Sequence, residues 1–264
     1  MHRPGLREGA ALRDARPGAP GSAGQGGLHG DGRQGVTSSG LRIEDLYVRI
    51  SGARIIEGLT LSVPVGDIVG LAGRNGAGKT TTLRAVSGLT GRSGGSVRLD
   101  GAPLPGRPEA VARSGVAHVP EGRGIFADLT VDENIRLGML AGRGRDDGLR
   151  RRLEEAFPAV ARLRGQKAGR LSGGEQQMLA LVRGLISRPR ILLVDEMSLG
   201  LSPRALRTAI ETVVAFGRAE GVGMLIVDQN SRMLHEHCDR MFLLKDGRVE
   251  PWDEAAESAS AYFD

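Results

Sequence analysis

The chain has 264 residues, of which 40% are hydrophobic and 25% are charged, a balance typical of a globular protein with a sizeable core. Aromatic residues make up only 3%, which argues against base-stacking platforms, and the net charge of +5 comes from scattered arginines. The single cysteine, Cys238, excludes an internal disulfide framework. Because no apolar stretch approaches the roughly 18 residues of a membrane span, we expect a soluble or membrane-peripheral protein with no nucleic-acid partner.

Residues 1–39 differ in composition from the rest of the chain. They are rich in Gly, Arg, Pro, Ala and Ser and contain hardly any large apolar residues. Such a segment cannot bury enough surface to offset its ordering entropy, so the sequence predicts a disordered tail followed by one folded domain over 40–264. A start codon assigned too far upstream would produce the same composition.

The folded part alternates between strand-like and helix-like patterns. Three segments near its start have the apolar pattern of strands: 41–48, 59–63 and 68–72. Turns and two helical stretches follow, over 131–140 and 149–157. From residue 172 the expected elements are a helix to about 187, a strand over 191–194, a helix over 203–219, a strand over 222–227 and a hairpin around Asp246 and Gly247. This alternation predicts an α/β fold with a mainly parallel sheet.

The segment after the third predicted strand has the pattern G-x-x-x-x-G-K-[ST] of a phosphate-binding loop. It reads Gly73-Arg74-Asn75-Gly76-Ala77-Gly78-Lys79-Thr80, and Thr81 continues into a helix. Glycines let the backbone approach phosphate closely, and N–H groups at a helix N-terminus supply positive potential. We expect Lys79 to reach the β- and γ-phosphates of a nucleotide and Thr80 to bind Mg²⁺. A plain glycine-rich turn does not account for the Lys-Thr pair in this context.

Two carboxylates follow the apolar strand at 191–194. Asp195 lies 116 positions after Lys79 (195 − 79), at the carboxyl end of the strand, where it can hold Mg²⁺ directly or through water. Glu196 can orient and deprotonate an attacking water. A polar cap on a strand end would explain the pair by itself, but together with the phosphate loop it predicts hydrolysis of a nucleoside triphosphate.

A third motif, Leu171-Ser-Gly-Gly-Glu-Gln-Gln177, opens the helix that ends near residue 187. We name residues 171–177 the signature segment. Ser172 and Glu175 have the spacing of a capping box, which accounts for only part of it. Gly173 and Gly174 predict a second anion-binding helix N-terminus. Because the phosphate loop already serves this chain's own nucleotide, the second site points to the nucleotide of a partner.

These three motifs resemble those of the ATP-binding cassette (ABC) family, and the resemblance extends from Leu41 to about Val249. It implies a P-loop NTPase fold with a RecA-like core, an antiparallel β subdomain and a helical subdomain over about 89–170. It also implies ATP and Mg²⁺ as cofactors. Two cassettes would pack head to tail, with each ATP between the phosphate loop of one subunit and the signature segment of the other, at Ser172, Gly173, Gly174 and Glu175.

Residues 115–123, 125–134 and 227–230 are similar to the LivF-like ATPases of branched-chain amino acid importers. That resemblance implies an ATPase at the cytoplasmic face of the cell membrane, with permease subunits, a solute-binding protein and a second cassette, either LivG-like or a copy of this chain. It also implies a surface near 121–134 that couples to the permease. The solute is only suggested, because the subfamily includes importers of related amino acids, urea and amides.

Two functional positions depart from the usual family pattern. Glu121 stands where most cassettes carry a glutamine that touches Mg²⁺, and Gln229 stands where most carry a histidine that contacts the γ-phosphate. A carboxylate can still bind the metal and an amide can still donate to phosphate, so both remain candidates for catalysis and Glu121 for metal binding. Ile50 stands where an aromatic usually stacks on adenine, and Tyr47 is three residues away.

Two other protein classes carry the same motifs. DNA-maintenance cassettes insert long coiled coils between the phosphate loop and the signature segment, whereas only 93 positions separate Lys79 from Ser172 (172 − 79), without sustained heptads. A non-transport cassette acting in assembly or translation is the main alternative to an importer. Translation factors of this family usually carry two cassettes, and this chain has one.

Overall fold

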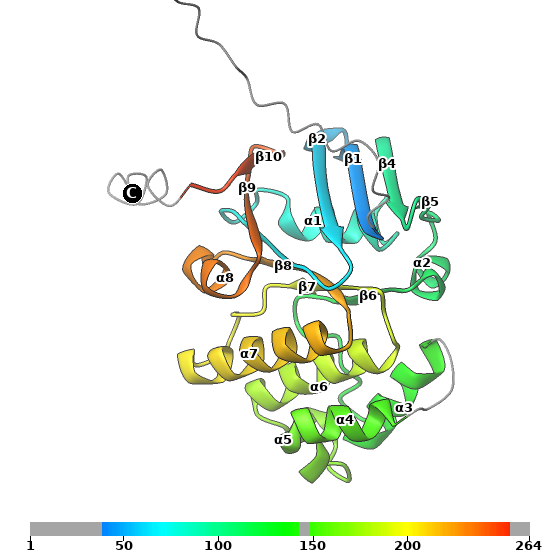
Figure 1. Ribbon diagram of the computed structural model, residues 1–264, viewed down its shortest axis with the longest axis vertical. Helices are drawn as coiled ribbons and strands as arrows, with labels where there is room; N and C mark the ends of the chain where they lie inside the picture. Colours follow the sequence, from blue (N-terminus) through cyan, green and yellow to red (C-terminus); the bar gives the residue numbers. More distant parts are fainter. Residues whose placement is uncertain (1–38, 143–147, 254–264) are drawn as a thin grey trace, which may run out of the picture. The chain divides into compact units, whose positions relative to one another are not determined.

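The computed structural model describes residues 39–142 and 148–253, which build two sheets and the helices around them (Figure 1). The predicted disordered tail lies outside the described residues except for Ser39. The α/β P-loop NTPase fold expected from the motifs is confirmed. Among the residues that the structure describes, no helix combines the length and apolarity that crossing a bilayer requires.

The larger sheet has the strand order β10-β9-β3-β8-β7-β6. Its strands are β3 (Ile68–Ala72), β6 (Val116–Val119), β7 (Ile191–Asp195), β8 (Gly223–Asp228), β9 (Arg240–Lys245) and β10 (Arg248–Pro251). All neighbours pair in parallel except β10, which forms the expected hairpin with β9. Strands β3, β7 and β8 are buried along their whole length, which explains their continuous apolar runs. Because parallel strands end at one edge, Ala72, Val119, Asp195 and Asp228 lie along that carboxyl edge.

The smaller sheet is antiparallel, with the order β2-β1-β4-β5. Its strands are β1 (Gly40–Ile50), β2 (Ala53–Pro64), β4 (Gly94–Leu99) and β5 (Ala102–Pro103). The glycine-rich start of β4 indicated only a turn in the sequence, but β4 pairs with β1. A β-carbon on Gly95 would lie 2.1 Å from the carbonyl oxygen of Asp45, so glycine is required where β4 pairs with the irregular part of β1 between Glu44 and Tyr47.

Helices lie on both faces of the parallel sheet (Figure 1). They are α1 (Lys79–Val86), α2 (Pro108–Ser114), α3 (Val131–Ala141), α4 (Leu149–Ala156), α5 (Pro158–Arg162), α6 (Gly173–Ile186), α7 (Pro203–Ala219) and α8 (Ser231–His237). Alternate side chains of β7 enter two cores. Leu192 and Val194 pack with α3 to α7, and Ile191 and Leu193 pack with α1 and the antiparallel sheet.

The helical part is shorter than the expected range of about 89–170. Its successive helices α3, α4 and α5 run from Val131 to Arg162. The stretch before them contributes β4 and β5 to the antiparallel sheet and β6 to the parallel sheet. Those strands are short. Strands β4 and β6 form because they pair with β1 and β7, which are distant in the chain, rather than because of a strong local pattern.

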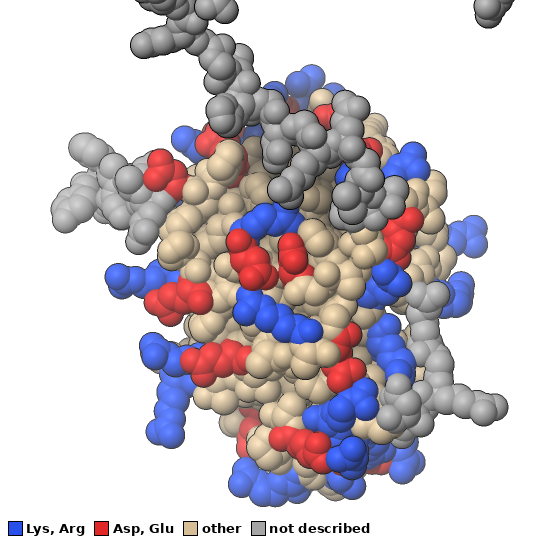
Figure 2. All heavy atoms as spheres, viewed as in Figure 1, with Lys and Arg blue, Asp and Glu red and all other residues tan. Residues whose placement is uncertain are grey.

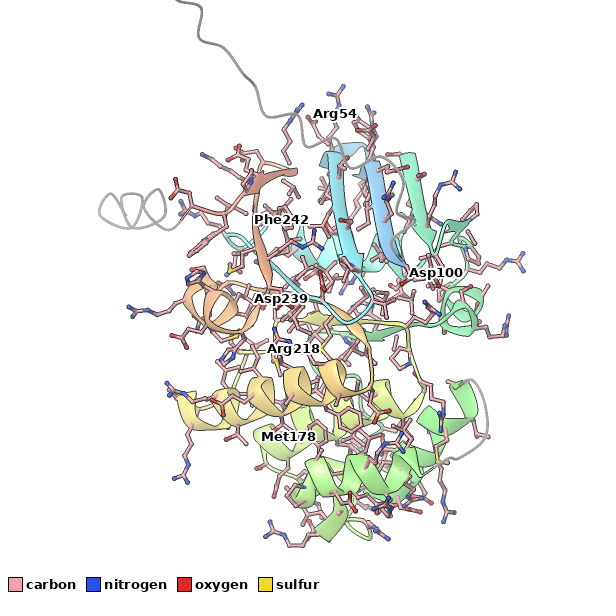
Figure 3. All side chains as sticks on the ribbon, in the orientation of Figure 1. Arg54, Asp100, Met178, Arg218, Asp239 and Phe242 are labelled. Carbon is pink, nitrogen blue, oxygen red and sulfur yellow. The ribbon has the colours of Figure 1, made fainter. Side chains whose placement is uncertain are left out.

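The amino end of the parallel sheet is held by ion pairs. Asp239 accepts a hydrogen bond from the Ile68 N–H at 2.8 Å and pairs with Arg218 of α7 at 2.6 Å (Figure 3). Arg240 pairs with Asp67 at 3.5 Å. Figure 2 shows positive and negative side chains interspersed on this face. The arginines here therefore serve in ion pairs with carboxylates.

Candidate functional site

The phosphate loop lies between β3 and α1, at the carboxyl edge of the parallel sheet. Gly76 and Gly78 have φ values of 80° and 107°, in the left-handed region that favours glycine. A β-carbon on Gly73 would lie 2.6 Å from the carbonyl oxygen of Leu244, and one on Gly78 would lie 2.6 Å from Cδ1 of Ile56. Close packing therefore requires glycine at 73, and close packing and backbone shape together favour glycine at 78.

Lys79 is the first residue of α1 and is 4% exposed. Its Nζ donates to the carbonyl oxygens of Gly73 at 2.8 Å and Arg74 at 3.1 Å, so the side chain folds back over the loop. Nζ also lies 3.8 Å from Oε1 of Glu196. A buried ammonium is stable only with such partners, which keep its charge at the centre of the loop.

Thr80 and Asp195 meet at the carboxyl end of β7. The Thr80 hydroxyl donates to Asp195 Oδ1 at 3.1 Å. Oδ2 of Asp195 is buried and has no hydrogen-bond partner among the described residues. Burial above all, opposed by the Thr80 hydrogen bond and reinforced by the charges of Glu196 and Glu121, raises the pKa of Asp195 to about 6.

These two residues form a donor set that fits Mg²⁺. A buried carboxylate oxygen without a partner and a neighbouring hydroxyl are hard oxygen ligands, the type that Mg²⁺ prefers. A divalent cation would also offset the cost of burying the charge of Asp195.

Glu196 follows β7 with a φ of 45°, unusual for a residue other than glycine. Its N–H donates to the carbonyl oxygen of Val227 on β8 at 2.9 Å. This turn directs the carboxylate towards Lys79 and therefore towards the phosphate loop. Strained backbone of this kind persists where surrounding contacts hold it in place.

Glu121 and Gln229 are both exposed at the same edge. Glu121 comes two residues after Val119, which pairs with Val194 immediately before Asp195. Gln229 directly follows β8, whose Val227 pairs with Asp195. The structure thus brings together the phosphate loop, the two carboxylates after β7 and the two unusual positions.

Asp228 is a site residue that the sequence reasoning missed. It is fully buried at the end of β8 and accepts from the N–H of Ser198 at 2.8 Å, from the Ser198 hydroxyl at 2.7 Å and from the N–H of Asn230 at 2.9 Å. The carboxylate thereby ties the turn after Glu196 to the turn that holds Gln229. An acidic residue directly after a buried apolar strand was the available sign.

The signature segment opens α6, and the predicted capping box is present. The Ser172 hydroxyl accepts from the Glu175 N–H at 3.4 Å, and the Glu175 carboxylate accepts from the Ser172 N–H at 2.9 Å. The hydrogen bonds that the Ser172 N–H and the Ser172 hydroxyl donate to this carboxylate lower the pKa of Glu175. Beyond its own helix, the segment contacts Arg123 and Gly200.

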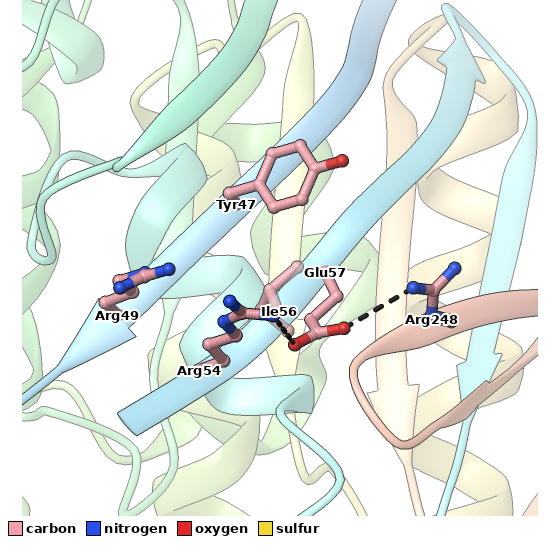
Figure 4. Close-up of a pocket in the computed structure, with 6 residues that line it drawn as sticks. All are labelled: Tyr47, Arg49, Arg54, Ile56, Glu57 and Arg248. Atoms are coloured by element: carbon pink, nitrogen blue, oxygen red, sulfur yellow. Dashed lines mark hydrogen bonds and ion pairs between the residues drawn. The ribbon is translucent and has the colours of Figure 1, made fainter. Parts of the chain in front are cut away.

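A cavity of about 330 Å³ lies between the antiparallel sheet and β10 (Figure 4). It is lined by residues of β1, β2 and β10: Tyr47, Arg49, Arg54, Ile56, Glu57 and Arg248. Glu57 pairs with Arg54 at 3.6 Å and with Arg248 at 3.4 Å. Ile56 is the residue that packs against Gly78. Tyr47 lines this cavity, whereas Ile50, at the end of β1, does not, although both side chains are exposed.

Comparison with known proteins yields a consistent set of relatives. The family model described as ABC transporter matches residues 56–198. The chain is 40% identical over 200 residues to the high-affinity branched-chain amino acid transport ATP-binding protein BraG of Pseudomonas aeruginosa, covering 75% of this chain and 85% of BraG. It is 32% identical to the lipopolysaccharide export system ATP-binding protein LptB of Escherichia coli, covering 79% and 88%.

Two further similarities point to the same family. The chain is 30% identical to the probable branched-chain amino acid transport ATP-binding protein LivF of Archaeoglobus fulgidus, covering 79% of this chain and 89% of that protein. A solved ATP-binding subunit of an ABC transporter superimposes with a TM-score of 0.71 at 27% identity, covering 84% of this chain and 94% of that one.

Proposed function

This chain belongs to the ABC transporter family as an ATP-binding subunit that hydrolyses ATP, and from that premise we propose that it powers an importer of branched-chain or related amino acids. The observation that supports ATP hydrolysis is structural. The phosphate loop, the Thr80–Asp195 pair and Glu196 lie together at one edge of the parallel sheet. The similarity to BraG and LivF supports the class of solute.

In the proposed mechanism, Lys79 and the N–H groups of the phosphate loop bind the β- and γ-phosphates of ATP. Glu196 accepts a proton from the attacking water, because its turn directs the carboxylate towards the loop. Gln229 donates its amide to the γ-phosphate. Arg74, Asn75, Ala77 and Thr81 contribute backbone or side-chain contacts to the phosphates.

Thr80 and Asp195 would hold Mg²⁺, and Glu121 would reach it directly or through water. When bound, the ion would neutralise phosphate charge during the transfer. Burial of Asp195 keeps its oxygens away from bulk water, and the Thr80 hydroxyl fixes the orientation of the carboxylate.

A second cassette would complete each site. Ser172, at the N-terminus of α6, is exposed at the surface. In a head-to-tail dimer, this helix N-terminus would meet the γ-phosphate of the ATP held by the partner. The partner is either a LivG-like subunit or a second copy of this chain. Closure of the dimer on two ATP molecules would drive the permease, and hydrolysis would reopen it.

The coupling segment, residues 121–134, would dock a permease at the cytoplasmic face of the membrane. Phe126 is 52% exposed, and its ring lies 5.2 Å from the Arg183 guanidinium carbon. Buried Asn134 accepts from the Phe126 N–H at 2.9 Å and donates to the Phe126 carbonyl oxygen at 3.0 Å. An exposed aromatic held firmly at its backbone suits an interface anchor.

The test is ATPase activity of the purified chain, alone and then in liposomes with the permease and cassette encoded beside it. We expect stimulation only in the complete assembly, with a further increase when a branched-chain amino acid and its binding protein are added. High activity indifferent to membrane partners would support a non-transport cassette. Stimulation by a lipopolysaccharide-transporting permease would support export, the function in the name of LptB.

A further inference from the structure

We propose that Arg123 is a positioning residue that couples binding at this chain's own nucleotide site to the orientation of the signature segment. The inference rests on the proposed function, since it assumes that the phosphate loop binds ATP and that the signature segment serves a partner's nucleotide. It assigns a role to a residue outside the three motifs.

The guanidinium of Arg123 touches two separate segments. Its Nη1 donates to Oε1 of Gln176 in α6 at 2.6 Å. Its Nη2 lies so close to the backbone that a β-carbon on Gly173 would be 3.0 Å away and one on Gly200 would be 3.3 Å away. Gly173 is the first residue of α6, and Gly200 belongs to the turn after Glu196. One side chain therefore bridges the signature segment and the turn that follows the catalytic carboxylate.

The backbone of Arg123 is held in an uncommon conformation. Its φ is 70°, between Gly122 at 76° and Gly124 at 57°. For a residue with a β-carbon, the left-handed region costs about 1–2 kcal/mol. The two glycines allow the chain to turn on either side of Arg123, and the contacts of the guanidinium offset the cost at 123 itself. Such strain concentrates at functional positions.

The other end of this short segment lies at the nucleotide site. Glu121 is two residues before Arg123 and two after Val119, which pairs with Val194 beside Asp195. Two residues of extended chain span at most about 7 Å. Because only Gly122 separates Glu121 from Arg123, a movement of Glu121 towards a cation at Asp195 can shift Arg123 and, through its contacts, Gln176 and Gly173.

Arg123 is not needed to form α6. The Ser172–Glu175 capping box closes the helix N-terminus, and buried Gln177, Leu179 and Ala180 anchor the first turns in the core. Within the described part of the chain, the guanidinium bonds to a neutral amide rather than to a carboxylate. Loss of Arg123 would therefore leave the helix intact and release its connection to residues 121–124.

The test is hydrogen–deuterium exchange of the full-length Glu196→Gln chain, with and without MgATP, at a concentration where light scattering shows a monomer. We expect ATP to slow exchange several-fold in peptides over 73–86 and 171–180. Arg123→Ala should retain the first effect and lose the second, and Gln176→Ala should do the same. Arg151→Ala, which removes an exposed pair with Glu155, is the matched control and should retain both effects.

The outcomes separate the two proposals. If ATP does not protect 73–86 in the parent chain, the proposed nucleotide site is wrong. If 73–86 is protected but 171–180 does not respond, or responds equally in Arg123→Ala, the coupling role is overturned. If Arg123→Ala melts well below the parent chain, Gln176→Ala decides, because it removes the same contact from the other side.

Discussion

Thr80 and Asp195 lie 115 positions apart in the chain, yet the Thr80 hydroxyl donates to the Asp195 carboxylate at 3.1 Å. The contact exists because β3 and β7 flank β8 in the parallel sheet, so α1 starts beside the carboxyl end of β7. It leaves the second oxygen of Asp195 buried without a partner among the described residues. That oxygen makes Asp195 costly to ionise.

The free-energy cost of ionising Asp195 predicts how the stability of the folded chain depends on pH. Its folded-state pKa of about 6 lies above the ordinary aspartate value of 3.8, so the folded chain binds this proton more tightly than the unfolded chain does. This contribution to stability is fully present below pH 3.8 and is lost as the pH rises through 6. In EDTA, Asp195→Asn should therefore gain melting temperature relative to the wild type between pH 4 and pH 7. A difference that does not change with pH would contradict the assigned cause.

His118 should act in the opposite direction. Burial, and then the charge of Arg84, lowers its pKa to about 4 from 6.5. The unfolded chain then binds the proton more tightly, so this contribution to stability is present above pH 6.5 and is lost as the pH falls through 4. His118→Gln should flatten that loss in melting curves taken from pH 7 to pH 4. His235→Gln is a matched histidine replacement and should leave the loss unchanged.

Glu196→Gln should abolish steady-state hydrolysis while ATP binding persists. Removing a general base commonly slows a reaction about 10²–10⁴-fold, and the amide keeps the size of the side chain. Radiolabelled ATP retained on the purified variant, together with phosphate release, measures both effects. Hydrolysis at the wild-type rate would show that another group accepts the proton.

Gly78→Ala should weaken ATP binding and lower the stability of the chain more than Gly76→Ala does. Both glycines have positive φ, which costs alanine about 1–2 kcal/mol. Only at 78 would the new β-carbon collide, 2.6 Å from Cδ1 of Ile56, whereas it would meet nothing within 4 Å at 76. ATP titrations and denaturant unfolding measure the difference. Adding Ile56→Ala should recover part of the Gly78→Ala loss in binding, and no recovery would show that the collision is not the cause.

Asp228 and Ser198 should be energetically coupled. Because Asp228 is fully buried and accepts two hydrogen bonds from Ser198, Asp228→Ala should destabilise the chain by about 1.5–3 kcal/mol. A double-mutant cycle with Ser198→Ala, followed by urea unfolding, should give a coupling energy of about 0.5–3 kcal/mol. Additive effects would mean that Asp228 acts mainly through the backbone N–H groups of Ser198 and Asn230, which Ser198→Ala leaves in place.

The sequence by itself determined the parts of this protein that are local. The phosphate loop, the Asp-Glu pair and the capped start of α6 are contiguous runs whose chemistry follows from residue type and spacing. The strand over 68–72 and the helix over 203–219 have the predicted bounds because a buried apolar run and an amphipathic helix between Ser202 and Glu220 carry their own boundaries.

Only the tertiary structure decided which distant residues meet. Strand β4 exists because β1 pairs with it, and its glycines alone indicate a turn. Asp228 reaches Ser198 because β7 and β8 are neighbours, and Arg123 reaches Gln176 because three left-handed residues turn the chain after β6. None of these contacts has a local sequence pattern. They depend on strand order and close packing, which arise when the whole core is buried together.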